Sequence, residues 1–362
     1  MRNDIVLSSR VRLARNYEDI PFDVSGRPEF AAICISRTAN ALKAAGVDKG
    51  FDMFRLKDMS EASRTAMAES RLISRDLLAN AASAAALIRA HDAVTVMMGE
   101  DDHLRIQAIR PEMDLLSAAS ACFRVDDALS RQVNFAFDEQ LGYLTACPTN
   151  TGTGMRASLL MHLPLLTKAK KMGDVGQLVS KVGLNIRGVY GEGSDALGNI
   201  YQISNQVTLG RTEQELISTV TALGNQLCDM ENALREKAKT EGRIPLEDVI
   251  YRAWGTMTNA RLMPLNEFYQ HWSNLRLGTA MGFLKLPLPV VDAMLDHALE
   301  AHLCVWAEEA LSGAALDEAR ATRMREMLGM TKCLCLYKQK GSTYADFCIL
   351  FQTGAVGNQA GP

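Results

Sequence analysis

The sequence has no long hydrophobic run and little net charge, and both absences exclude a class of protein. The longest apolar stretches, such as Leu159 to Leu166, are interrupted by His162 and Pro164. They are far shorter than the roughly 20 apolar residues that span a bilayer, so we expect no transmembrane helix. A formal net charge of −3 gives no basic field for nucleic acid. We therefore expect neither a membrane protein nor a protein that binds nucleic acid directly.

Paired cysteines are also missing. The 8 cysteines are scattered without a Cys-x-x-Cys motif, so the sequence indicates neither a disulfide framework nor a four-ligand zinc site. The first residues, Met1 to Leu7, lack the apolar core of a signal peptide. An Arg-rich transit peptide is the alternative, but Asp4 argues against it. A cytoplasmic protein without a protein-held metal fits best.

Two common kinase signatures do not occur. The chain contains neither G-x-x-x-x-G-K-[ST] nor an H-R-D catalytic loop. The P-loop and eukaryotic-type protein kinase interpretations therefore lose their main support.

What the chain does have is four short blocks that together carry five arginines and several carboxylates. Arginine is always charged, and its planar fork of donors matches phosphate oxygens in pairs. A convergent cluster needs an anion, and a nucleotide triphosphate would satisfy that need; any one of these arginines alone could equally lie on a solvated surface. The blocks are Ser8-Ser9-Arg10-Val11-Arg12, Gly99-Glu100-Asp101-Asp102-His103-Leu104-Arg105, Cys147-Pro148-Thr149-Asn150 running on to Arg156-Ala157-Ser158, and Arg187-Gly188-Val189-Tyr190-Gly191-Glu192.

A chain of 362 residues is long enough for two domains. Mixed strands and helices predict an α+β domain over residues 1–238, and a charged segment with Gly242 and Pro245 marks its end. A helical domain over 239–352 and a disordered tail over 353–362 follow. The expected strands are 94–98 and 103–107, paired as a hairpin around the acidic turn, and 132–137, 184–189 and 200–204; the expected helices are 115–131, 155–171, 213–237, 246–259, 265–277, 289–311 and 316–328.

The arginine blocks resemble, in the same order, motifs of the phosphagen kinase family: S-[ST]-R-x-R, N-E-E-D-H-x-R, C-P-T-N-x-G-T and R-G-x-x-G-E. The resemblance implies an antiparallel sheet flanked by helices, of the glutamine-synthetase-like kind, followed by an all-α domain. Small-molecule phosphagen kinases carry a helical domain before the catalytic one. Here the arginines begin near residue 10 and the helical part comes last, which is similar to the bacterial protein-arginine kinases of the family.

The resemblance implies that ATP binds through these blocks, with Mg²⁺ held mainly through the nucleotide. Family members often have a histidine near the nucleotide where this chain has Arg71, so we expect Arg71 to face the adenine or ribose. The implied ATP- and phosphate-binding residues are Ser8, Ser9, Arg10, Val11, Arg12, Arg71, Arg105, Arg156, Ala157, Ser158, Leu159, Leu160, Arg187, Gly188, Val189, Tyr190 and Gly191.

An arginine acceptor has delocalised nitrogen lone pairs and a pKa above about 12. Two carboxylates can hold its fork and receive the proton that leaves. The resemblance implies Asp101 and Glu192 for this role, with Asp101 as the proton acceptor, and Cys147 as a reactive cysteine beside the guanidinium. The alternatives are turn acids pointing to water and an inert buried thiol. For His103 we favour packing over nucleotide binding.

Two departures from the family pattern bear on activity. Gly99-Glu100-Asp101-Asp102 replaces Asn-Glu-Glu-Asp, so the expected base is one methylene shorter. In the helical domain, Leu316 replaces the leading arginine of an R-D-x-x-R-A motif that receives phosphoarginine. Asp317 and Arg320 remain as candidate phosphoarginine-binding residues. An ordinary pair at i, i+3 on a helix surface is an equal alternative.

The sequence therefore predicts ATP-dependent phosphorylation of arginine side chains in proteins. The resemblance implies a stress-response and quality-control role, a zinc-binding activator protein, a Clp-type protease that degrades marked substrates, and a homodimer. One alternative is a kinase for free arginine or another small guanidino compound. The other is a weakly active regulatory module that binds ATP or phosphoarginine.

Overall fold

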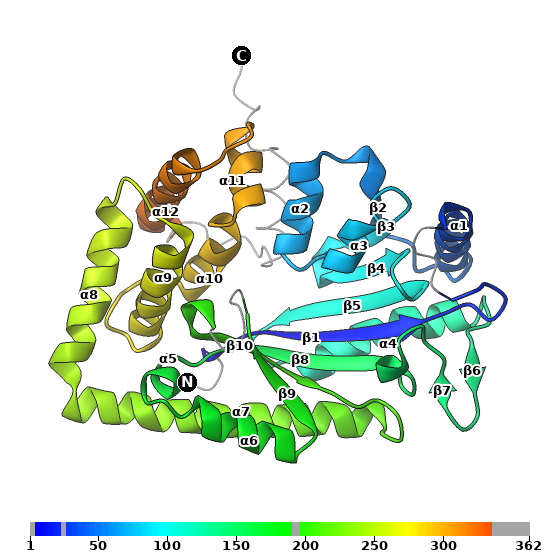
Figure 1. Cartoon of the computed structure of the whole chain (residues 1–362), viewed down its shortest axis with the longest axis horizontal. Coiled ribbons are helices and arrows are strands. Elements are labelled where there is room, and N and C mark those ends of the chain that lie inside the picture. The colour runs from blue at the N-terminus through cyan, green and yellow to red at the C-terminus, as the bar shows by residue number, and fades with distance from the viewer. Residues whose placement is uncertain (1–3, 23–26, 190–195, 335–362) are drawn as a thin grey trace.

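The computed structural model describes residues 4–22, 27–189 and 196–334 (Figure 1). Its centre is an eight-stranded sheet in the order β2-β3-β4-β5-β1-β8-β10-β9. All neighbouring strands in it run antiparallel. Its strands are β1 (Val6–Arg15), β2 (Phe51–Arg55), β3 (Ala85–Arg89), β4 (Val94–Met98), β5 (Leu104–Pro111), β8 (Met155–His162), β9 (Leu184–Gly188) and β10 (Ile200–Asn205), and a small hairpin is formed by β6 (Phe137–Asp138) and β7 (Gly142–Tyr143).

Helices lie on both faces of the sheet and form the C-terminal part of the chain (Figure 1). They are α1 (Pro28–Ala44), α2 (Glu61–Glu69), α3 (Arg75–Ala79), α4 (Leu115–Ser130), α5 (Pro164–Lys168), α6 (Met172–Lys181), α7 (Glu213–Glu241), α8 (Arg243–Asn259), α9 (Leu265–Ala280), α10 (Leu288–His297), α11 (Glu300–Ala307) and α12 (Ala314–Leu334). Within the described residues, none of these helices has both the length and the apolar character needed to cross a membrane.

One face of the sheet is the main hydrophobic core. Along β1, Val11 and Leu13 point into this core, and α1, α4, α6 and α7 cover it. Because side chains alternate along a strand, Arg10 and Arg12 lie on the opposite face. The burial of the apolar set fixes the register, and with it the position of the arginines.

The opposite face is covered at its two ends by different parts of the chain. At the β2–β4 end, α2 and α3 pack Met67 and Leu77 against the sheet. At the β8–β10 end, the C-terminal helices α8 to α12, which we call the helical domain, pack Phe268 and Trp272 of α9 against Leu160. Between these two coverings, β1, β5 and β8 present polar side chains.

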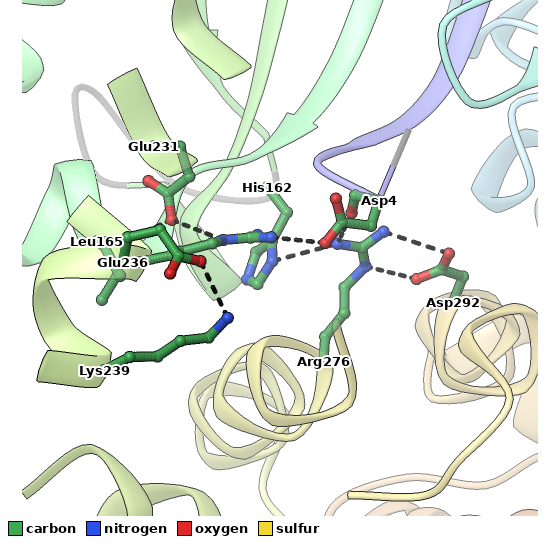
Figure 2. A network of polar contacts seen from close by, with 9 residues as sticks. Asp4, His162, Leu165, Glu231, Glu236, Lys239, Arg276 and Asp292 are labelled. Carbon is green, nitrogen blue, oxygen red and sulfur yellow. Dashed lines mark hydrogen bonds and ion pairs between the residues drawn. The ribbon is translucent and has the colours of Figure 1, made fainter. Parts of the chain in front are cut away.

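A buried charge network joins the sheet to the helical domain (Figure 2). Arg276 of α9 donates to the Asp4 carbonyl at 2.7 Å and to Asp292 at 2.6 Å. Arg235 of α7 donates to the Asp4 carboxylate at 2.6 Å. His162, at the end of β8, contacts Ser273 at 2.8 Å, and burial holds its pKa well below the usual value. Paired in this way, the buried charges hold the start of β1 against α7, α9 and α10.

The predicted α+β class, the hairpin of β4 and β5, and the helical C-terminal part are confirmed. The helix predicted over 155–171 is wrong, because β8 occupies 155–162 and α5 begins at Pro164. β8 is buried almost throughout, and a continuous apolar run cannot be assigned to helix or strand by periodicity. Pro164 is tolerated because it lies in the first turn of α5.

Smaller differences concern element ends. Of the strand predicted over 132–137, only Phe137 is extended in β6, and the helix predicted over 289–311 divides into α10 and α11. The predicted domain boundary after residue 238 lies inside α7, which continues to Glu241 before the corner at Gly242. The predicted tail, 353–362, lies outside the described residues.

Candidate active site

Strand register places the arginines of three blocks side by side. Arg12 lies directly opposite Arg156 of β8, and Arg10 lies two residues along β1 on the same face. Arg105 of β5 lies opposite Ala14, which shares that face. Directly opposite residues in antiparallel strands point the same way, so these arginines share one surface.

Arg187 joins the same surface from β9. It lies opposite Gln202 of β10, and Gln202 lies opposite Leu160, which in turn faces Ser8. Arg10 donates to the Gln202 side chain at 3.1 Å, and Arg156 donates to the Ser204 hydroxyl at 3.1 Å. We call the surface formed by Arg10, Arg12, Arg105, Arg156 and Arg187 the arginine face.

These cations perturb one another electrostatically. Arg10 is the largest cause of a lowered pKa at Arg12, followed by burial, Arg105 and Arg156. Burial lowers the pKa of Arg156, and Arg187 and Arg105 lower it further. Each charged form is therefore less favourable than it would be in water. A polyanion bound on the arginine face would remove this repulsion.

Glu100 is a site residue that sequence reasoning did not select. Its carboxylate is almost fully buried and forms an ion pair with Arg105, with 2.9 Å between Oε2 and Nη1. The Ser74 hydroxyl donates to the other oxygen. Burial raises the pKa of Glu100 to about 7, against the opposing effect of Arg105 and Arg12. The available signal was its place two residues after the fully buried strand β4.

The acidic turn between β4 and β5 has one exposed and one buried acid after Glu100. Asp101 is exposed at the tip. Asp102 is buried and accepts hydrogen bonds from the Asn16 side chain at 2.7 Å and the Ala146 amide at 2.8 Å. The Ala146 contact holds the turn beside the segment that carries Cys147.

His103 has a structural role, as we favoured. Its Nδ1 accepts from the Tyr17 amide at 2.9 Å, so its Nε2 carries the proton and donates to the Pro21 carbonyl at 2.8 Å. Burial lowers its pKa, which keeps the ring neutral.

Cys147 is half-buried on a turn fixed by hydroxyl groups. Its sulfur lies 3.0 Å from the Thr149 hydroxyl. Thr208 donates to the Thr149 carbonyl at 3.1 Å and to the Thr151 carbonyl at 2.6 Å. A Cβ at Gly152 would lie 2.6 Å from the Thr208 carbonyl oxygen, so this close approach requires glycine. These contacts fix the path of the backbone that follows Cys147.

The remaining predicted nucleotide residues divide by face. Seven residues line a small pocket on the arginine face, and Arg71, Ser8, Ser158 and Leu160 are among them. The pocket is lined by Ser8, Arg10, Arg71, Ile109, Ser158, Leu160 and Gln202.

The side chains of Ser9, Val11, Ala157 and Leu159 lie on the other face, so they point away from the arginine face. Ser9 donates to the Glu112 carbonyl at 2.7 Å, and the other three belong to the main core. Gly188 is the last residue of β9, and Val189 comes directly after the strand. Tyr190, Gly191 and Glu192 lie outside the described residues.

The candidate phosphoarginine residues hold the helical domain together. Arg320 is 3% exposed and donates to the Ala298 and Met263 carbonyls, each at 2.7 Å. It also donates to Asp317 at 2.8 Å. In this arrangement its guanidinium is committed to protein acceptors.

In the described part of the chain, no group of three or more His, Cys, Asp or Glu side chains is arranged to hold a metal ion. Carboxylates near the arginine face are Glu100, which is paired with Arg105, and the exposed Asp101.

Comparison with known proteins identifies relatives of both parts of the chain. The family "ATP:guanido phosphotransferase, C-terminal catalytic domain" matches residues 34–234, and "Protein-arginine kinase McsB C-terminal domain" matches residues 243–339. Protein-arginine kinase of Moorella thermoacetica is 40% identical over 329 residues, covering 90% of this chain and 94% of the relative. That of Bacillus subtilis is 38% identical over 330 residues, covering 90% of each.

Solved structures agree with the fold. The duplicated taurocyamine kinase from Schistosoma mansoni with bound transition state analog components is similar with a TM-score of 0.58 and 25% identity. The match covers 72% of this chain and 39% of that duplicated protein.

Proposed function

The chain belongs to the ATP:guanido phosphotransferase family, and we propose that it transfers the terminal phosphoryl group of ATP to arginine side chains of other proteins. The observation that carries the proposal is the convergence of five arginines from four strands on one face, next to an acidic turn and a half-buried cysteine. Relatives that align over nine-tenths of the chain are protein-arginine kinases.

The arginine face would bind the triphosphate. Phosphoryl transfer needs charge neutralisation along the phosphates and in-line placement of the acceptor, with little covalent work by the protein. Neighbouring arginines and burial disfavour the charged forms of Arg12 and Arg156, so a bound polyanion would stabilise both. The ion pair with Glu100 holds the Arg105 side chain in place.

The acidic turn and the cysteine turn would hold the acceptor. An N–P bond forms to the acceptor guanidinium while the bond from the γ-phosphorus to the β,γ-bridging oxygen breaks, and ADP leaves. We assign the departing guanidinium proton to the Asp101 carboxylate. Glu192 would hold the other side of the acceptor guanidinium, and the Cys147 thiol would contact this guanidinium. Asp102 positions both turns through Asn16 and Ala146.

We propose that Mg²⁺ binds mainly through the phosphate oxygens of ATP. Magnesium commonly keeps several waters and takes few protein ligands. The ion would supply further neutralisation of phosphate charge.

A protein acceptor is supported by exposure at the acceptor end of the site. Asp101, Pro148 and Thr149 are exposed, so an arginine on a large molecule can approach them. From similarity to the family alone, we further infer a cytoplasmic role in stress response and protein quality control. The same similarity suggests a zinc-binding activator protein and a Clp-type protease as partners, and a homodimer as the assembly.

We infer that phosphoarginine capture in the helical domain is weak. Leu316 replaces the leading arginine of the family motif. Arg320 is already hydrogen-bonded to Ala298, Met263 and Asp317. A phosphoarginine would have to displace these acceptors.

The test is to incubate the purified protein with ATP and magnesium and either free arginine or an unfolded arginine-rich protein. Acid-labile phosphate on protein arginine, lost in the Glu192→Gln variant, is expected. Phosphorylation of free arginine alone would support a small-molecule kinase. ATP binding without transfer to either acceptor would support a regulatory module.

A further inference from the structure

Arg71 links the arginine face to the helical domain. We propose that the helical domain positions Arg71 on the arginine face, through the contact of His302 in α11 with Glu69 and Ser70 at the end of α2. His302 and Glu69 are then positioning residues for ATP binding. This inference rests on the proposed ATP site and adds a residue set from the other domain to it.

The backbone at Arg71 is the first observation. Arg71 has a φ of 61°, in the left-handed region. Its amide donates to the Ala68 carbonyl at 3.0 Å, and the Leu72 amide donates to the Met67 carbonyl at 3.0 Å. These two bonds define a Schellman motif that ends α2, with Arg71 at the position where glycine is usual. A non-glycine residue there is strained and persists where its surroundings or its role require it.

The second observation is where Arg71 lies. It lines the small pocket on the arginine face together with Arg10, Ser158 and Gln202. Its carbonyl accepts from the Gln107 side chain at 2.8 Å, and Gln107 lies directly opposite Arg12 in the sheet. The strained residue is thus anchored on the sheet beside the phosphate-binding arginines.

The third observation is the clamp on α2. The Glu69 carboxylate accepts from the amides of Ala301 and His302, both at 3.2 Å, and from His302 Nδ1 at 2.8 Å. The His302 Nε2 atom forms a hydrogen bond of 2.9 Å with the Ser70 hydroxyl, which is also hydrogen-bonded to the Asp296 carboxyl. Glu69 thereby caps the start of α11, which lies beside α2 (Figure 1). His302 spans Glu69 and Ser70, the two residues before Arg71.

A carboxylate of the helical domain also faces Arg71. Burial raises the pKa of Asp296 in α10, and Arg71 is the largest of the charges that oppose the rise, ahead of His302. Arg71 is therefore close enough to Asp296 to interact with it electrostatically, and it also lines the pocket on the arginine face. A shift of α10 and α11 would change the position of Arg71, and with it the cationic surface available to phosphates.

Arg71→Gly separates a functional arginine from a structural one. Glycine suits the left-handed backbone, so the melting temperature should equal or exceed that of the wild type. Affinity for a non-hydrolysable ATP analogue with magnesium, measured by calorimetry, should fall about tenfold through loss of one charged contact. The matched Arg71→Ala variant should lose the same affinity without the gain in stability. Wild-type affinity in Arg71→Gly would overturn the inference.

His302→Ala tests the positioning role. It should weaken binding of the analogue by up to about tenfold and add little in the Arg71→Gly background, because both changes remove the same contact. His302→Gln keeps a polar group near the Ser70 hydroxyl and should restore part of the affinity. Additive losses, or unchanged affinity with a lower melting temperature, would show a structural contact only. If the unmodified protein binds the ATP analogue but phosphorylates no arginine, the proposed function is wrong, and the inference about Arg71 and His302 is unaffected.

Discussion

The Glu100 carboxylate is buried and lies 2.9 Å from the guanidinium of Arg105, a member of the arginine face. It is an acid held next to a cluster of cations that themselves repel one another. We therefore expect the charge of Glu100 to affect how strongly the arginine face attracts phosphates. A residue that does not touch the acceptor can still tune nucleotide affinity.

Nucleotide affinity should depend on pH through Glu100. Its pKa is raised to about 7, so the acid is largely neutral at about pH 6 and largely ionised at about pH 8. Lower pH leaves the arginine face more positive. Affinity for ADP with magnesium should therefore rise about tenfold when the pH is lowered from about 8 to about 6. Glu100→Gln should bind tightly at both pH values. Calorimetry on the two proteins at both values measures the difference, and an equal slope in both would refute the assignment.

The same raised pKa has a consequence for stability. Folded Glu100 binds a proton more tightly than unfolded glutamate, so the wild type loses stability as pH rises from about 4.5 through about 7. Glu100→Gln should lack this component. Melting temperatures of both proteins at about pH 5 and about pH 8 test the direction of this change. A wild type that becomes more stable, relative to the variant, as the pH rises would contradict the prediction.

Asp101→Asn should lower phosphorylation of protein arginine by about a hundredfold to ten-thousandfold, because the amide cannot take the guanidinium proton. Affinity for an ATP analogue should remain nearly unchanged, since Asp101 lies at the exposed end of the site. Asp101→Glu restores the methylene that the family has, and should retain activity. Full activity in Asp101→Asn would remove this residue from the mechanism.

Arg12→Met should stabilise the protein without nucleotide while weakening ATP binding. Removal of one cation relieves the repulsion from Arg10 and its neighbours, and about 1 kcal/mol of added stability is expected. Loss of a charged phosphate contact should cost about 2 kcal/mol of binding. Thermal unfolding with and without ATP measures both effects. A variant that is less stable and binds normally would show that Arg12 serves the fold.

Cys147 should be labelled by a thiol reagent before Cys34 and Cys122. Those two are fully buried, and burial raises their thiol pKa, to about 12 for Cys34. Cys147 is half-buried, and the preceding residue, Ala146, is hydrogen-bonded to Asp102 of the acidic turn. Prior addition of ADP, magnesium and an arginine peptide should slow labelling at Cys147 only. Site-resolved mass spectrometry gives the rates; equal protection of Cys304 would point to a global effect.

The sequence was sufficient to find the arginines, because each stands inside a recognisable block of residues. It did not separate Arg10 and Arg12 from Ser9 and Val11, although strand alternation, once β1 is known, puts them on opposite faces. The error at β8 has the same origin. An apolar run that carries Arg156 into the sheet centre has no clean period to identify it.

Other features depend on contacts between distant residues. Glu69 and His302 are separated by 233 positions, and no local pattern pairs them. The buried Glu100 and the exposed Asp101 are neighbours with similar chemistry, and only the packing of the turn distinguishes them. Propensity and motif specify the elements and the candidate side chains, whereas burial and pairing assign their roles.

The most direct test of the arginine face as the triphosphate site is a crystal structure with a non-hydrolysable ATP analogue, magnesium and an arginine peptide. Phosphate oxygens should contact Arg10, Arg12, Arg105, Arg156 and Arg187, with the peptide guanidinium at Asp101 and Cys147. Phosphates bound elsewhere on the molecule, or a guanidinium remote from Asp101, would contradict the account.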